Sequence, residues 1–280
     1  MPSSQRIPSW LRKLFVVLLL VPAVLWLGAM GWLWRQQERL LFAPEVLAQD
    51  HAFTQADTQE EWVNVPGARL HALHLRQPLI NGQRHTKGIV FYLHGNAGNV
   101  ATWYTNYDFW HRSGYDLFML DYRGFGKSSG HIENEAQLHD DVMRAWRQIE
   151  PEYAGLKHVI FGRSLGTGLA ARLATQVHSD LLVLVSPYQS IEAMATARYP
   201  WVPSAVLRYP MHTDEWLPQI SSPIVMFHGD QDALIPIAHA QALQARQAAA
   251  RLIRIEGAGH GDIQNHPDYT QALSRLLDSL

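Results

Sequence analysis

The sequence predicts an α/β domain, built on a mostly parallel sheet with helices on both faces and preceded by one transmembrane helix. Three observations lead to this prediction. The composition, with 47% hydrophobic and 17% charged residues among 280, is that of a globular protein. Apolar stretches of strand length alternate with helical stretches, which is typical of a parallel sheet buried on both faces. Residues 14–34 contain no charged side chain.

The uncharged stretch 14–34 is the expected membrane anchor. Its 21 residues would form a helix of roughly 31 Å, close to the thickness of the hydrocarbon core of a bilayer. Trp10 precedes it, and Trp32 and Trp34 lie at its end, where interfacial aromatic residues gather. The alternative is a cleaved signal peptide. We expect an uncleaved signal anchor, because the stretch is long and the tryptophans occupy the place of small cleavage-site residues.

Basic residues flank the anchor on both sides. Arg6, Arg12 and Lys13 precede it, and Arg35 and Arg39 follow it. This bias of three against two favours a single-pass protein with a cytoplasmic N-terminus and a domain outside the cytoplasm. We divide the chain into a basic N-terminal segment (1–13), the transmembrane anchor (14–34), a connector (35–59) and one domain (60–280).

The expected elements of the domain follow one another regularly. A hairpin turns at Pro66 and Gly67, and strands and helices alternate after it. The expected strands are 60–66, 69–76, 88–95, 115–124, 158–166, 181–187, 222–230 and 251–259, and the expected helices are 136–149, 167–177 and 238–248.

An insertion at 191–220 interrupts this alternation. Its four prolines exclude one regular helix. Tyr199 and Trp201 lie among these prolines and could form an apolar lid over a substrate. Ordinary packing of prolines and aromatic residues explains the same composition, and both interpretations stay open.

Ser164 is the expected nucleophile. The chain has no Cys to supply a thiol, and its net charge of −2 gives no basic surface for nucleic acid. The G-x-S-x-G sequence 162–166 lies between an apolar strand and a helix of small residues, as in a nucleophile elbow. The glycines permit a tight turn, and the N-terminus of the following helix stabilises negative charge. The alternative is a glycine-rich turn with an incidental serine.

A serine nucleophile needs an acid and a base, which follow it in the order acid, then His, in this architecture. His260, in the loop after the last strand, is the expected base, because ligand chemistry collects at the carboxyl ends of parallel strands. His266 is the second candidate. The acid is Asp230 or Asp232, and the spacing alone does not separate them.

The oxyanion hole is expected from two backbone N–H groups, those of Asn96 and Leu165. Asn96 lies in the loop that follows strand 88–95, and Leu165 follows the nucleophile. His94 in the same loop is expected to be structural.

A metal centre is the alternative use of the histidines and aspartates near the C-terminus. It would leave the serine elbow unexplained, so we expect no metal and no cofactor. The side chains that could form such a cluster are His228, Asp230, Asp232, His260, Asp262 and His266.

Five motifs together resemble the α/β-hydrolase superfamily, and more narrowly its membrane-anchored, single-domain α/β-hydrolase domain-containing branch. The resemblance covers about residues 60–275 and implies the α/β-hydrolase fold with an eight-stranded sheet. It also implies that Asp232 is the acid of the triad, that Asp230 forms the turn, and that the loop 121–130 is structural. The motifs are FYLHGNAG, DYRGFGKSSG, FGRSLGTG, HGDQDALIP and GAGHGD.

The expected function is that of a serine hydrolase. Ser164, His260 and Asp232 would cleave an acyl ester or thioester of a lipid-like substrate through an acyl-enzyme and without a cofactor. Two alternatives stay open: a serine peptidase or amidase on the same fold, and a catalytically idle, membrane-anchored interaction protein.

Overall fold

A twisted sheet of eight strands forms the centre of the domain in the computed structural model, which describes residues 8–280. Its spatial order is β12-β11-β10-β9-β6-β8-β3-β2. Only β3 runs antiparallel to its neighbours, so the predicted, mostly parallel sheet is confirmed. The strands are β2 (Thr58–Val65), β3 (Ala68–Leu75), β6 (Gly88–Leu93), β8 (Asp116–Leu120), β9 (Lys157–Arg163), β10 (Leu181–Val185), β11 (Ile224–Gly229) and β12 (Arg251–Ile255).

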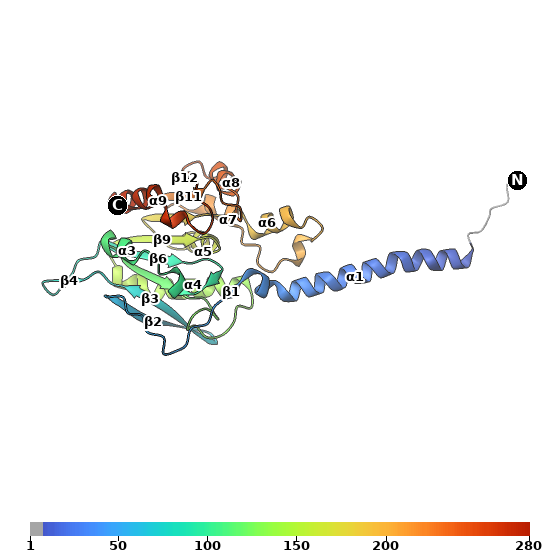
Figure 1. Ribbon diagram of the computed structural model, residues 1–280, viewed down its shortest axis with the longest axis horizontal. Helices are drawn as coiled ribbons and strands as arrows, with labels where there is room; N and C mark the ends of the chain where they lie inside the picture. Colours follow the sequence, from blue (N-terminus) through green and yellow to red (C-terminus); the bar gives the residue numbers. More distant parts are fainter. Residues whose placement is uncertain (1–7) are drawn as a thin grey trace.

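Helices cover both faces of this sheet (Figure 1). Side chains of β6 alternate between the faces, as the strand period requires. Phe91 packs edge-on against Trp146 on one face, and Tyr92 packs edge-on against Trp110 on the other. The helices are α2 (Val100–Trp103), α3 (Tyr107–Ser113), α4 (Glu135–Ile149), α5 (Gly166–Ala174), α6 (Ile191–Arg198), α7 (Thr213–Trp216), α8 (Ala238–Arg246) and α9 (Pro267–Asp278).

Several parts of the fold add to the sequence prediction, among them α2 and α3 between β6 and β8, α9, and two short strand pairs. The predicted elements end at residue 259, whereas α9 follows and buries Tyr269, Leu273 and Leu277, which are spaced by four residues. Two short strand pairs are also new. They are β1 (Ala43–Pro44) with β7 (Ala97–Gly98), and β4 (Leu79–Ile80) with β5 (Gln83–Arg84).

The N-terminal helix α1 (Ser9–Leu41) extends away from the domain (Figure 1). It is long and apolar enough to cross a membrane, and most of its side chains are exposed. Its last seven residues belong to the predicted connector, so the helix continues past that boundary. Arg6 lies outside the described residues, as does the rest of 1–7.

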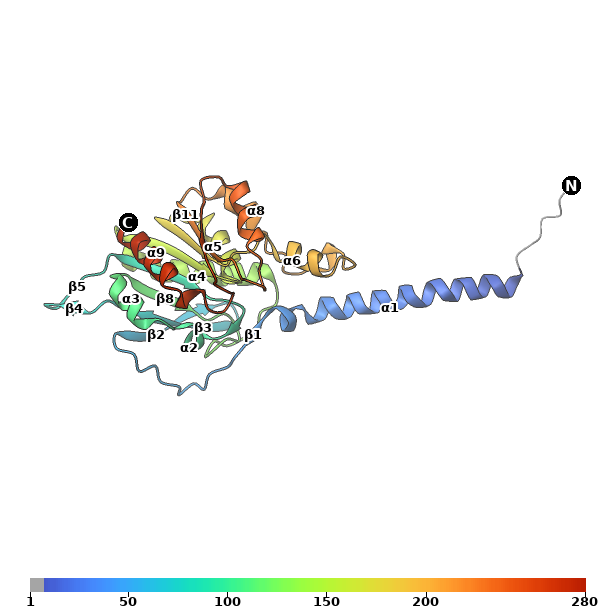
Figure 2. The same cartoon turned by 45° about the horizontal axis from the view of Figure 1, so that its top comes forward.

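The insertion at 191–220 lies on the side of the domain from which α1 emerges. Figures 1 and 2 both place α6 near the end of α1 that joins the domain. The insertion contains α6, α7 and two single 3₁₀ turns rather than one regular helix, as its prolines predict. We call residues 191–209 the lid segment.

Candidate active site

The elbow at Ser164 is as tight as the glycine pattern predicts. Ser164 follows the last residue of β9 with a positive φ of 52°, which side chains rarely adopt. A Cβ on Gly162 would lie 2.5 Å from the carbonyl oxygen of Gly166. A Cβ on Gly166 would lie 2.0 Å from that of Leu93. Only glycine fits at these two positions, and the turn holds Ser164 at the carboxyl edge of the sheet.

Three side chains form a continuous hydrogen-bonded chain at this edge. His260 Nε2 lies 3.0 Å from Ser164 Oγ, and His260 Nδ1 lies 2.8 Å from Asp232 Oδ2. When Nδ1 donates to the carboxylate, Nε2 is left to accept from the hydroxyl. The structure therefore brings together the three residues predicted as nucleophile, base and acid, in the arrangement that general-base activation of a serine requires.

Asp232 is held as a carboxylate. Burial alone would raise its pKa, but the hydrogen bonds from His260 and from the backbone N–H of Ile235 outweigh burial, and the pKa lies below its ordinary value. Its Oδ1 also accepts a hydrogen bond from the N–H of Leu234, at 3.0 Å. An ionised Asp232 is placed to accept the hydrogen bond of His260 Nδ1.

Asp230, two residues earlier, does not reach His260. Its carboxylate accepts two hydrogen bonds from Arg254, at 3.0 and 2.6 Å, and one from the N–H of Gly257, at 2.8 Å. These contacts close the turn between β11 and the loop after β12. This is the turn-forming position that the resemblance implies for Asp230.

The other candidate histidines lie in structural positions. His228 is fully buried and hydrogen-bonds to the carbonyl of Ile235, and burial lowers its pKa. His94 is fully buried beside Asp121. His266 lies 3.8 Å from Asp262, on the far side of a 3₁₀ turn from His260. Among residues 8–280 the structure shows no group of three or more His, Asp or Glu side chains that could hold a metal ion.

The loop 121–130 is braced by buried charges. Arg123 makes two hydrogen bonds to Asp141, at 2.6 and 3.0 Å, and donates to the carbonyl of Pro66. Gly126, with a φ of 52°, has no room for a Cβ because the Asp121 carboxylate would lie 2.0 Å away. These contacts hold the loop that packs behind His94.

Asn96 and Leu165 lie beside Ser164, lining the same cavity. The Asn96 loop is fixed by the end of α1. Asn96 Nδ2 donates to the carbonyl of Leu41, and the N–H of Ala43 donates to the carbonyl of Asn96, at 2.9 and 2.8 Å. The sequence alone gives no sign of this link, because 55 residues separate Leu41 from Asn96.

The cavity at Ser164 has a volume of about 600 Å³ and mostly apolar walls. That size is within the range of small-molecule sites. Its walls come from α1, the loop after β6, the elbow, the loop after β10, the lid segment and the loop after β11. The lining residues are Leu33, Gln37, Leu40, Leu41, Asn96, Ser164, Leu165, Tyr188, Ile191, Met194, Ala195, Arg198, Tyr199, Val202, Leu207, Ala233, Leu234 and Ile235.

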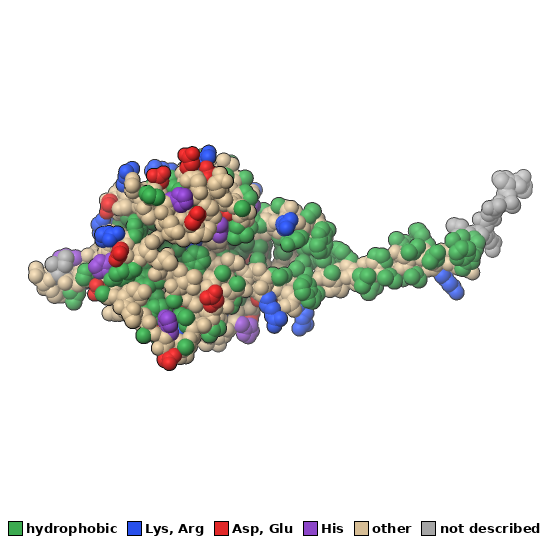
Figure 3. All heavy atoms as spheres, in the orientation of Figure 1, with side chains coloured by type: hydrophobic (Ala, Val, Ile, Leu, Met, Phe, Trp, Pro, Cys, Tyr) green, Lys and Arg blue, Asp and Glu red, His purple; other side chains and the backbone are tan. Residues whose placement is uncertain are grey.

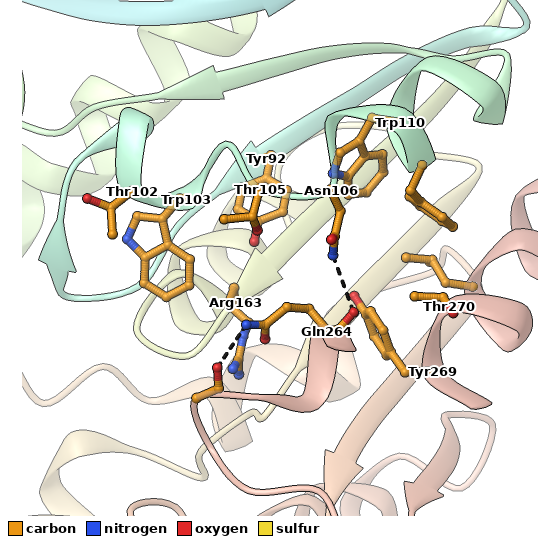
Figure 4. A pocket seen from close by; sticks show the side chains of 13 residues that line it. Tyr92, Thr102, Trp103, Thr105, Asn106, Trp110, Arg163, Gln264, Tyr269 and Thr270 are labelled. Atoms are coloured by element: carbon orange, nitrogen blue, oxygen red, sulfur yellow. Dashed lines mark hydrogen bonds between the residues drawn. The ribbon is translucent and has the colours of Figure 1, made fainter. Parts of the chain in front are cut away.

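A second, smaller cavity of about 210 Å³ is lined by Arg163, the residue before the nucleophile (Figure 4). Arg163 is 4% exposed, burial lowers its pKa, and its Nη2 donates to the carbonyl of His260. Asn106 donates to the carbonyl of Gln264 in the same loop, at 3.3 Å. Arg163 was not among the residues predicted from the sequence, although its place inside the elbow was a usable signal.

The sheet order, the elbow at the end of β9 and the histidine loop after β12 define an α/β hydrolase. Solved structures share this fold. An esterase from Pyrococcus furiosus superposes with a TM-score of 0.67 at 17% identity, over 85% of this chain and 97% of that one. A monoacylglycerol lipase from Paleococcus ferrophilus superposes with a TM-score of 0.57 at 18% identity, over 75% and 98%.

Sequence relatives narrow the class. A family model described as serine aminopeptidase, S33, matches residues 84–213. Alpha/beta hydrolase domain-containing protein 17B of Xenopus tropicalis is 30% identical over 200 residues, which are 69% of this chain and 67% of the relative. The human protein of the same name is 28% identical over the same shares. The chain belongs to the α/β-hydrolase domain-containing family, and it is a hydrolase.

Proposed function

We propose that the protein is a serine hydrolase that cleaves acyl esters or thioesters of lipid-like substrates. One observation carries the proposal: Ser164 Oγ lies 3.0 Å from His260 Nε2 and lines a large, mostly apolar cavity. A nucleophile paired with its base marks the reaction as acyl transfer, and apolar walls suit a hydrocarbon acyl chain.

The reaction follows from the contacts of the triad. Ser164 Oγ attacks the acyl carbonyl carbon while its proton passes to His260 Nε2, and Asp232 stabilises the imidazolium. The imidazolium then protonates the departing alcohol or thiol, which leaves an acyl-serine. A water molecule gives a proton to the same nitrogen and attacks the acyl-serine, and the proton returns to Ser164 Oγ as the acid product leaves. No cofactor is required.

The oxyanion of each tetrahedral intermediate would be stabilised by the backbone N–H groups of Asn96 and Leu165. Both residues line the cavity beside Ser164. The N-terminus of α5, which begins at Gly166, adds a favourable dipole at the same place.

The peptidase alternative has support from the description of the matching family model, serine aminopeptidase. An aminopeptidase must bind a protonated amine, for which a carboxylate is the ordinary partner. The residues that line the cavity at Ser164 include Arg198 and no Asp or Glu. The charge of these walls favours an uncharged acyl group over the free N-terminus of a peptide.

Membrane attachment is the second part of the proposal. Helix α1 would anchor the protein through residues 14–34, with the domain outside the cytoplasm. The helix should resist carbonate extraction, and protease added to sealed cells should digest the domain. A soluble product that begins near residue 30 would contradict the anchor, and a protected domain would contradict the orientation.

Labelling with a fluorophosphonate tests the nucleophile directly. We expect the adduct on the tryptic peptide that follows Arg163, and hydrolysis of p-nitrophenyl esters of graded chain length. Ser164→Ala should fold, melt within a few degrees of the wild type, and lose both labelling and hydrolysis. Labelling at another serine would refute the assignment, and an unlabelled, inactive wild type would favour the idle interaction protein.

A further inference from the structure

The last two turns of α1 contribute side chains to the cavity that holds Ser164. Leu33, Leu40 and Leu41 line it together with the lid segment. Residues 14–27 of the same helix expose almost all of their large apolar side chains. We call residues 33–41 the root of α1. One continuous helix therefore joins an apolar span to the wall of the catalytic cavity.

A buried glutamine fixes the root to the lid segment. Gln37 is 4% exposed, its Nε2 donates to the carbonyl of Val206 at 2.7 Å, and its Oε1 accepts from the N–H of Arg208 at 2.7 Å. A primary amide that bonds backbone groups on both its sides sets one register between two segments. The root and the lid segment are held as one unit.

An ionic and aromatic cluster around Arg208 reinforces this contact. Arg208 Nη1 lies 2.5 Å from Glu38 Oε1, and its guanidinium stacks over the ring of Trp34 at 4.7 Å. The hydroxyl of Tyr209 donates to Glu38 at 2.8 Å. These side chains lie at the domain end of the apolar span, where charged and aromatic groups would meet a lipid headgroup layer if α1 crosses a bilayer.

The mouth of the cavity has an apolar rim on the same side. Tyr199 and Trp201 of the lid segment are 50% and 59% exposed, and Leu40 and Leu234 are exposed to a similar degree. Figure 3 shows hydrophobic side chains along α1 and over the part of the domain that projects beside it. Exposed aromatic and aliphatic groups next to a membrane span suit insertion into the interface of a bilayer.

We propose that the root of α1 and the lid segment form an entrance through which the acyl chain of a bilayer-resident substrate reaches Ser164. This inference rests on the proposed function and adds the route and the physical state of the substrate. A chain that moves from the bilayer between Leu40 and the lid segment stays in apolar surroundings and is not exposed to water on the way.

A pair of leucine variants tests the entrance in the full-length protein reconstituted in phosphatidylcholine vesicles. Leu40→Glu places a charge at the mouth of the cavity, whereas Leu156→Glu changes an exposed leucine that does not line it. We expect Leu40→Glu to lower kcat/KM at least tenfold for a long-chain ester incorporated in the vesicles. Hydrolysis of water-soluble p-nitrophenyl butyrate should fall by a clearly smaller factor, and an unchanged Tm should show that the variant folds. Leu156→Glu should change neither rate.

Photo-crosslinking gives a second measurement that does not depend on turnover. A long-chain fluorophosphonate with a terminal diazirine should label Ser164 and, after irradiation, crosslink to tryptic peptides 40–69 or 199–208. If butyrate is cleaved through Ser164 but Leu40→Glu affects both esters equally or neither, and crosslinks fall elsewhere, the entrance is wrong and the hydrolase stands. If the wild type cleaves no ester and its serine is not labelled, the proposed function itself fails.

Discussion

Two neighbouring residues of the elbow line two different cavities. Ser164 lines the cavity of about 600 Å³, whose walls are mainly apolar, and Arg163 lines the cavity of about 210 Å³, whose walls include several amide and hydroxyl side chains. The lid segment and α1 form part of the wall of the first cavity, while the second cavity lies behind the loop of His260. In the proposed reaction, the same turn would therefore have two tasks: Ser164 would contact the substrate, and Arg163 would position the loop of His260.

Removing the triad acid should give the largest effect. We expect Asp232→Asn to lower kcat by about 10⁴-fold, because the imidazole loses the group that sets its tautomer and stabilises its charged form. The measurement is hydrolysis of p-nitrophenyl butyrate. If Asp230→Asn abolished activity with the fold intact while Asp232→Asn did not, the assignment of the acid would be wrong by two residues.

A substitution at Arg163 tests whether this side chain positions the loop of His260. Arg163→Met removes the hydrogen bond to the carbonyl of His260, and we expect kcat to fall about 10²-fold, as a small displacement of a catalytic group can cause. KM should stay near the wild-type value, because Arg163 does not line the cavity at Ser164. Arg172→Met, on α5 and away from both cavities, is the control. A rise in KM with unchanged kcat would assign Arg163 to substrate binding instead.

A larger side chain in the cavity at Ser164 should alter the preference for the length of the acyl chain. Ala195 lines the cavity at Ser164, whereas Ala197, two residues later on α6, does not. We expect Ala195→Trp to lower kcat/KM for a dodecanoate ester by about tenfold relative to the butyrate ester, in line with the small discrimination that apolar pockets give. Ala197→Trp should leave the ratio unchanged. The same shift in both variants would show that the effect is on folding of α6.

The turn aspartate should give the smallest effect, confined to stability. Hydrogen bonds from Arg254 are the main cause that lowers the pKa of Asp230. A lowered pKa in the folded state means that ionised Asp230 stabilises the fold above its unfolded pKa of about 3.9, and that this stabilisation is lost as the pH falls through the folded value. We expect Asp230→Asn to lower Tm by a few degrees at pH 7, with the difference shrinking below pH ~4. Asp140→Asn, on an exposed face of α4, is the control and should leave Tm at pH 7 unchanged.

Local patterns predicted much of this molecule. The alternation of apolar strands and helices predicted the sheet, and two glycines around Ser164 predicted an elbow that the positive φ at Ser164 now explains. The choice between Asp230 and Asp232 needed a family resemblance, because both lie in one turn and only the three-dimensional path decides which carboxylate faces His260.

The sequence did not predict the contacts between distant parts of the chain. Gln37 and Arg208 lie 171 residues apart, and Arg163 and His260 lie 97 residues apart. A glutamine next to an apolar span indicates the polar end of a helix. Nothing in the adjacent sequence indicates that this side chain is buried. Its role follows only from the path that brings the lid segment back to α1.

The conformation of Ser164 has a consequence for evolution and engineering. A residue other than glycine in the left-handed region costs roughly 1–3 kcal/mol, so the elbow trades stability for the position of one hydroxyl. Glycine adopts this conformation without strain, whereas alanine does not. Ser164→Gly should therefore melt at a higher temperature than Ser164→Ala, although both variants should be inactive. Selection for thermal stability alone would therefore favour glycine at position 164, and only selection for turnover would retain the serine.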